Sequence, residues 1–176
     1  LLKEIYFAKT YGVSIEVDFY FFYLSIFGWP AAIILSVFSA IFIPVIANLD
    51  GEKRDVFIGE LTGNTIVFSI LLLILFAFFN DFFIGLFPYN DLLDDVSLSY
   101  GYLVFIIPIF LLISLFSVLI MSSGDKTNTL LEGLPALFLL IYFVFTMSKN
   151  LDDLIIATVV AFVIQTVSLV TFWKFK

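Results

Sequence analysis

The sequence contains no cysteine and no histidine, and charged residues make up only 13% of it. Without cysteine the chain can form no disulfide, thiol nucleophile or thiolate metal site, and without histidine it lacks the commonest general base and metal ligand. No basic segment is interleaved with polar sequence, which disfavours nucleic-acid binding. We therefore expect no catalytic residue, no metal or cofactor site and no nucleic-acid partner.

Apolar residues dominate instead, at 62% of the chain with a mean hydropathy of +1.17. Soluble domains contain roughly 45–50% apolar residues, so this composition predicts an integral membrane protein. The net charge of -7 comes from acidic residues that collect between the apolar runs, which is typical of loops. The predicted fold is all-α, because helices satisfy their own backbone hydrogen bonds in lipid.

The apolar runs predict a single transmembrane lobe, 1–176, with the end of a first helix and about five complete helices after it. The chain starts at Leu1 without an initiator methionine, so we expect a fragment whose truncated first helix covers residues 1–11. Gly12 suits the end of that helix and Ser14 suits a new N-cap. The predicted transmembrane helices cover residues 18–48, 59–87, 96–123, 129–148 and 153–173.

Small and polar residues form stripes on several of these helices. The second helix carries no charge between Asp18 and Asp50, and at about 100° per residue its small and polar residues share one sector of roughly 80°. Such stripes either line a hydrated cavity or pack helices together in lipid, and both interpretations stay open. The stripes consist of Asp18, Ser25, Gly28, Ala32, Ser36 and Ser39; of Thr62, Thr65 and Ser69; and of Thr158, Ala161, Gln165 and Ser168.

Charge and turn signals add orientation and helix boundaries. Basic residues near helix ends stay preferentially cytoplasmic, so the 50s loop, the 120s loop and the C-terminus are predicted to be inside. Thr129 and Glu132 have the spacing of a capping box, and Pro108 predicts a kink. The basic residues that set the orientation are Lys53, Arg54, Lys126, Lys174 and Lys176.

The candidate cavity residues each have a second interpretation. Lys3 lies inside the first helix and either faces a cavity or forms an ion pair or snorkels. Asp18 either contacts substrate or accepts hydrogen bonds from backbone amides at a helix start. Gln165 is either a cavity donor or an interhelical hydrogen-bonding residue. Ser25 and Ser36 follow the stripe of the second helix and share its two interpretations.

Several residues along the chain occur in the same order as the characteristic residues of one transporter family. The residues are Lys3-Glu4, Ala8, Tyr11-Gly12, Ser14, Asp18 before aromatics, Phe42-Ile43-Pro44, Pro88, Pro108 before Leu111-Leu-Ile-Ser-Leu115, and Gln165 before a basic end. Together they resemble the MviN/MurJ family of lipid II flippases. The resemblance covers essentially the whole chain, as the first-half lobe without most of its first helix.

This resemblance implies one lobe of a two-lobe transporter of the MOP exporter superfamily, whose lobes rock to open a central cavity to each side of the bacterial cytoplasmic membrane. Its implied partners are a lipid-linked glycan, membrane lipid and a missing C-terminal lobe. Lys3 matches a cavity arginine, and Asp18 matches an aspartate at the start of the second helix. Ala31-Ala32-Ile33 stands where lipid II flippases carry a basic pair, which leaves room for another lipid-linked saccharide.

The preferred hypothesis is therefore a flippase lobe that translocates a lipid-linked glycan precursor, such as lipid II or a related polysaccharide intermediate, by alternating access. One alternative is an ion-coupled small-molecule exporter of the same superfamily. Another is a non-transporting membrane scaffold of a polysaccharide assembly complex, in which the polar stripes only pack helices together.

Overall fold

The computed structural model describes residues 5, 8, 9, 11, 12, 15–79, 82, 98–146 and 150–174. These residues form helices and turns without any strand. Five of the helical segments are long and apolar enough to cross a membrane. The protein is an all-α membrane protein, as the composition predicted.

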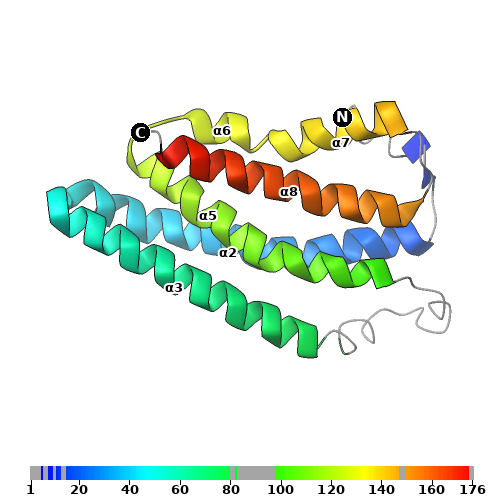
Figure 1. Cartoon of the computed structure of the whole chain (residues 1–176), viewed down its shortest axis with the longest axis horizontal. Coiled ribbons are helices and arrows are strands. Elements are labelled where there is room, and N and C mark those ends of the chain that lie inside the picture. The colour runs from blue at the N-terminus through cyan, green and yellow to red at the C-terminus, as the bar shows by residue number, and fades with distance from the viewer. Residues whose placement is uncertain are drawn as a thin grey trace.

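The helices run lengthwise beside one another (Figure 1). Their bounds are α2 Ile15–Asn48, α3 Gly51–Phe78, the 3-10 helix η2 Leu98–Phe105, α5 Ile106–Ser122, α6 Thr127–Leu131, α7 Leu134–Thr146 and α8 Leu151–Lys174. Most of η2 continues into α5 to give one span, Tyr102–Ser122, and α6 with α7 gives another, Thr127–Thr146.

Helix α5 lies at the centre and packs against α2, α3 and α8, while α7 packs mainly on α8 (Figure 1). Its sequence is apolar around the whole circumference apart from serine hydroxyls, which suits a helix that is covered on all sides. Leu111, Leu115 and Leu119 are buried in this central position. The peripheral helices are thereby held at fixed places around α5.

The outward faces of the peripheral helices are strongly apolar. On α3, Val67 and Leu71 are exposed and Phe78 is 83% exposed. Soluble monomers rarely expose contiguous apolar patches above roughly a few hundred Å². These faces are therefore suited to contact with lipid chains or with further membrane helices, and the buried side of α3 is its contact with α5.

Several helix boundaries differ from those expected from sequence. Helix α3 begins at Gly51 and not near residue 59, because the charged residues that suggested a loop form its first turns, with Glu52 in the favourable N-terminal position. Pro108 falls in the first turn of α5, directly after the 3-10 helix η2. The expected end of the third helix near residue 87 lies outside the described residues.

The predicted fifth helix is divided into α6 and α7, with the break at Glu132 and Gly133. The predicted capping box at Thr129 is wrong. Helix α6 begins earlier because Asp125 Oδ1 accepts a hydrogen bond from the Thr127 backbone N–H at 2.8 Å. The Glu132 side chain accepts from Asn128 Nδ2 instead.

Two glycines end helical segments with a left-handed backbone. Gly12 has φ 65°, and its N–H donates to the Ala8 carbonyl at 3.0 Å, as expected for a helix end at this position. Gly124 has φ 76°, and its N–H donates to the Met121 carbonyl at 2.9 Å after α5. The Gly124 turn reverses the chain between the spans Tyr102–Ser122 and Thr127–Thr146.

The α2–α3 turn, the α5–α6 loop and the C-terminal end of α8 lie at the same end of the bundle (Figure 1). Lys53, Arg54, Lys126 and Lys174 belong to these connections or to the helix ends beside them. The helices therefore bring these four basic residues to one side of the membrane, the side predicted to be cytoplasmic.

Candidate binding groove

Two adjoining pockets form a groove between α2 and α7, with α8 between them. The tyrosine pocket has a volume of about 420 Å³ and includes Tyr20, Phe143 and Thr158 in its lining. The glutamine pocket has a volume of about 340 Å³ and includes Ala32, Glu132 and Gln165 in its lining. Both pockets are lined by Pro135, Ala136 and Phe162, so they adjoin along the groove.

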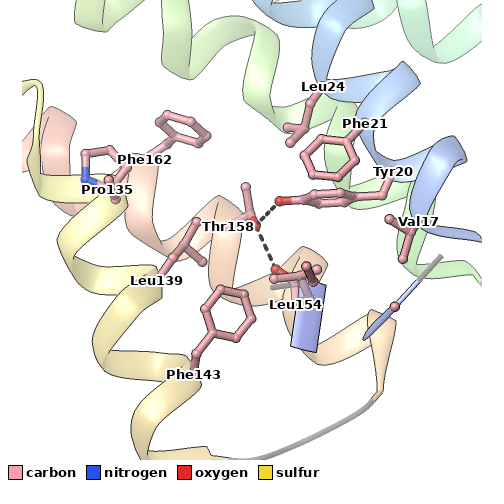
Figure 2. Close-up of a pocket in the computed structure, with 13 residues that line it drawn as sticks. Val17, Tyr20, Phe21, Leu24, Pro135, Leu139, Phe143, Leu154, Thr158 and Phe162 are labelled. Carbon is pink, nitrogen blue, oxygen red and sulfur yellow. Dashed lines mark hydrogen bonds between the residues drawn. The ribbon is translucent and has the colours of Figure 1, made fainter. Parts of the chain in front are cut away.

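A hydrogen-bonded pair joins α2 to α8 in the wall of the tyrosine pocket (Figure 2). The hydroxyls of Tyr20 and Thr158 lie 2.8 Å apart, and both residues are buried. Thr158 donates its only hydroxyl hydrogen to the Leu154 carbonyl at 2.8 Å, so Tyr20 is the donor to Thr158. The bond leaves no polar hydrogen of this pair directed at the pocket.

The rest of the tyrosine pocket is largely hydrocarbon. Figure 2 shows the aliphatic and aromatic side chains of α2, α7 and α8 around the central space. A pocket of this kind favours an apolar ligand such as a lipid chain. The named side chains are Val17, Leu24, Leu139, Phe143, Leu154 and Phe162.

The helix end before Gly12 reaches the tyrosine pocket through Ala8. Tyr11 packs edge-on against Phe143 with ring centroids 6.1 Å apart, and its hydroxyl donates to the Asn150 carbonyl at 3.4 Å. Burial raises the pKa of Tyr11, and the nearby Tyr142 and Asp153 raise it further. Tyr11 therefore stays a neutral hydrogen-bond donor at physiological pH.

The glutamine pocket carries the polar side chains of the groove. Gln165 is only 5% exposed, and its side chain makes no hydrogen bond within the described part of the chain. Ser114 Oγ donates to the Phe110 carbonyl at 2.9 Å and approaches the Ala31 carbonyl at 3.4 Å. An apolar pocket with a few convergent polar groups is the usual form of a ligand site.

Glu132 lies at the break between α6 and α7, inside the span Thr127–Thr146. Its Oε1 accepts a hydrogen bond from Asn128 Nδ2 at 2.7 Å. Asn128 is 3% exposed, and among the described residues its Oδ1 has no hydrogen-bond partner. The carboxylate and a buried amide therefore form a polar cluster beside the pocket.

The sequence candidates are distributed unevenly. Gln165 lines the glutamine pocket, whereas Asp18, Ser25 and Ser36 are exposed residues that line neither pocket. Ser25 Oγ donates to the Phe21 carbonyl at 2.8 Å, and Asp18 lies in the first turn of α2. Lys3 lies outside the described residues, so its cavity role stays a prediction.

The polar stripes prove to have different roles on different helices. Thr65 and Ser69 are buried on the side of α3 that packs on α5, and they donate to the carbonyls of Leu61 and Thr65 within their own helix. Thr158 bonds across to α2, whereas Gln165 on the same helix lines the pocket. The α3 stripe is thus a packing surface, and the α8 stripe serves both packing and the groove.

Sequence reasoning gave Glu132 a local capping role and left Asn128 out. Glu132 was identified only by its capping-box spacing from Thr129, and Asn128 belongs to no recognisable motif. The break that brings Glu132 to the pocket follows from Gly133 and Pro135. Glycine and proline commonly interrupt helices, so the close spacing of Gly133 and Pro135 was the sequence signal for this break.

Comparison with known proteins shows a similarity over part of the chain. Across 94 residues, which are 49% of this chain, the sequence is 32% identical to the lipid II flippase MurJ of Thermosipho africanus (strain TCF52B). Half of this chain is similar to a lipid II flippase. The alignment spans 18% of the flippase's own length. No family model matches the chain, and no solved structure matches it.

Proposed function

We propose that this chain forms one lobe of a flippase that translocates a lipid-linked glycan precursor across the bacterial cytoplasmic membrane by alternating access. The similarity to a lipid II flippase is the observation that carries the proposal. The same proposal includes the cargo class, which is lipid II or a related polysaccharide intermediate. It also includes a second lobe that would complete the cavity.

The groove supports this function by its two chemically different pockets. The tyrosine pocket offers an apolar surface, while Gln165, Glu132 and Ser114 in the glutamine pocket are residue types that bind sugar hydroxyls. Each pocket volume, about 420 and about 340 Å³, lies within the roughly 300–1,000 Å³ typical of ligand sites. A saccharide with an attached lipid requires such neighbouring polar and apolar surfaces.

An ion-coupled exporter of small molecules is the second candidate. The described lining of the glutamine pocket contains one charged residue, Glu132, and no basic residue. Ala31 and Ala32 line the glutamine pocket, at the positions where the MviN/MurJ family that this sequence resembles carries a basic pair. An acidic lining favours a neutral or cationic cargo over a pyrophosphate.

Binding to the full chain in lipid nanodiscs tests the first candidate. The probe is lipid II, the reference is polyprenyl phosphate without sugar, and native mass spectrometry gives both dissociation constants. We expect lipid II to bind at least about tenfold more tightly, a difference of about 1.4 kcal/mol. Replacing Gln165 by Leu should weaken lipid II binding about 2- to 10-fold by removing one hydrogen-bonding group.

Ser69→Ala is the matched control, because Ser69 is buried against α5 and lines neither pocket. It should leave lipid II binding unchanged. Equal affinity for lipid II and polyprenyl phosphate would contradict the proposal. Tighter binding of tetraphenylphosphonium than of lipid II, with loss in Glu132→Gln, would favour the exporter.

A further inference from the structure

We propose that the groove between α2 and α3 is a docking surface for a transmembrane helix of a partner protein, and that this helix carries a lysine or arginine at the depth of Glu60. Two pockets of about 350 and about 380 Å³ adjoin here, because both are lined by Phe57 and Glu60. We name the two pockets together the α2–α3 groove. It is separate from the tyrosine and glutamine pockets, whose described linings contain no residue of α3.

The α2–α3 groove has one packed side and one open side. Helices α2 and α3 meet at their connecting turn and diverge toward their other ends (Figure 1). Near the turn, the rings of Phe42 and Phe57 lie 6.1 Å apart and join the two helices. Leu61 and Thr65 line the groove and are buried on the side of α3 that packs on α5. The bundle therefore fixes the inner side of the groove, and a further helix can occupy its open side.

Glu60 places a carboxylate inside the membrane. It belongs to the span Gly51–Phe78, and with α3 centred in a hydrocarbon core of roughly 30 Å it lies about 7 Å inside that core. Its side chain is exposed and forms no hydrogen bond or ion pair within the described part of the chain. Glu52 and Lys53, the other charged residues of the described lining, lie about 10–12 Å nearer the membrane surface. Ionisable residues at the depth of Glu60 usually face a partner, and lipid chains offer no hydrogen-bond donor.

The neighbours of Glu60 on α3 suit a helix as this partner. Asn64 follows one turn later on the same face, lines the groove and is also exposed. Gly59 and Gly63 lie beside these two residues, and a Cβ added at either glycine would meet no atom within 4 Å. Glycines at this spacing let a second membrane helix approach closely, and asparagine side chains form hydrogen bonds across such contacts. The α2–α3 groove thus offers close backbone approach and polar pairing together.

Charge favours a partner protein over a second copy of this chain. Copies in one membrane share the same orientation, so their α3 helices would run parallel and bring Glu60 close to Glu60 at the glycine contact. Like charges repel strongly in a surrounding of low dielectric constant. A partner helix with one lysine or arginine at this depth instead neutralises the carboxylate, and arginine can also donate to the Asn64 side-chain oxygen. This docking does not depend on the cargo of the proposed flippase.

The test is association of the full chain with a synthetic transmembrane helix in phosphatidylcholine vesicles, measured by resonance energy transfer. The chain has no cysteine, so Lys126→Cys in the α5–α6 loop supplies a single site for the donor dye. The probe is a leucine–alanine helix of about 25 residues with an acceptor dye and one lysine, placed as far from the helix end as Glu60 is from the start of α3. The reference peptide has leucine in place of that lysine. We expect the lysine peptide to bind at least about tenfold more tightly.

Variants of α3 separate the charge contact from the close approach. Glu60→Gln should lower the affinity for the lysine peptide at least about tenfold and leave that for the leucine peptide unchanged. Gly63→Ile should weaken binding of both peptides about 3- to 30-fold, and Gly63→Ala should weaken it less, because alanine still permits a close approach. Asp55→Asn is the charge-matched control, because this exposed carboxylate on α3 lines neither pocket of the groove. It should bind both peptides as the unaltered chain does.

Equal affinity for the two peptides would overturn the proposal, and so would a preference for the lysine peptide that persists in Glu60→Gln. Energy transfer between donor-labelled and acceptor-labelled copies of the chain, at lower concentration than with the lysine peptide, would also overturn it. The α2–α3 groove would then be a contact between copies. The assay contains no lipid-linked substrate, so its failure is distinguishable from failure of the flippase proposal.

Discussion

The hydrogen bond between Tyr20 and Thr158 should contribute measurably to the packing of α2 on α8. Tyr20→Phe removes the donor but leaves Thr158 bonded to the Leu154 carbonyl, so no buried group loses its only partner. Interhelical hydrogen bonds in membrane proteins contribute about 0.6 kcal/mol on average and up to about 1.7 kcal/mol. We expect Tyr20→Phe to lower the free energy of unfolding by an amount in this range.

Thr158→Val should cost more than Tyr20→Phe. It leaves the Tyr20 hydroxyl buried, in a residue that is 3% exposed, without the acceptor that it has now. The expected loss is about 1–3 kcal/mol. In the double variant this penalty disappears, so its destabilisation should be smaller than the sum of the single effects by about 0.6–1.7 kcal/mol.

The assay is reversible unfolding in mixed micelles with increasing sodium dodecyl sulfate, followed by the fluorescence of Trp29 and Trp173. Ser168→Ala is the control, because its hydroxyl donates to the Ile164 carbonyl of its own helix. It should change stability by no more than about 0.5 kcal/mol. Additive effects of Tyr20→Phe and Thr158→Val would refute the reasoning, since they would show that the two hydroxyls are energetically independent.

Three further pairs of substitutions test the groove and a turn. Gly28→Ala should be tolerated within about 0.5 kcal/mol, because an added Cβ would lie 3.7 Å from Phe110, whereas Gly28→Leu should destabilise by about 1–3 kcal/mol in the same unfolding assay. Gly124→Ala should cost about 1 kcal/mol because φ is 76°, and Gly124→Asn should cost less; equal losses would contradict this reason. Gln165→Cys should react with a small water-soluble methanethiosulfonate because it lines the pocket, and Val67→Cys on the exposed apolar face of α3 should not; equal protection of both would show a dry pocket.

The fold class was predictable because the hydrophobic runs are long enough to cross a bilayer and contain few charges. Helix boundaries were less predictable where strong helix formers carry charge. Residues such as Glu52 and Lys53 suggested a loop by polarity, yet they belong to the first turns of α3. Charged residues indicate that a segment contacts water. The ends of transmembrane helices contact water at the membrane surface and are still helical, so charge alone does not mark a loop.

The groove was predictable only in part. Gln165 was a candidate because a long amide inside a membrane helix needs a partner or a cavity. Ser25 and Ser36 were grouped by angle with Gly28 and Ala32 on the same helix; Gly28 and Ala32 line the groove, whereas the two serines do not. A serine hydroxyl can bond to its own helix, as Ser25 does, so it can occupy many faces without a cavity.

Transport by the protein expressed from its whole gene gives the most direct test of the proposed function. The protein is reconstituted into vesicles that contain fluorescent lipid II, and an impermeant quencher added outside reports how fast labelled headgroups cross the bilayer. We predict crossing well above the rate in protein-free vesicles, and slower crossing with Gln165→Leu than with Ser69→Ala. A rate equal to that of protein-free vesicles would contradict the assignment of this chain to a flippase.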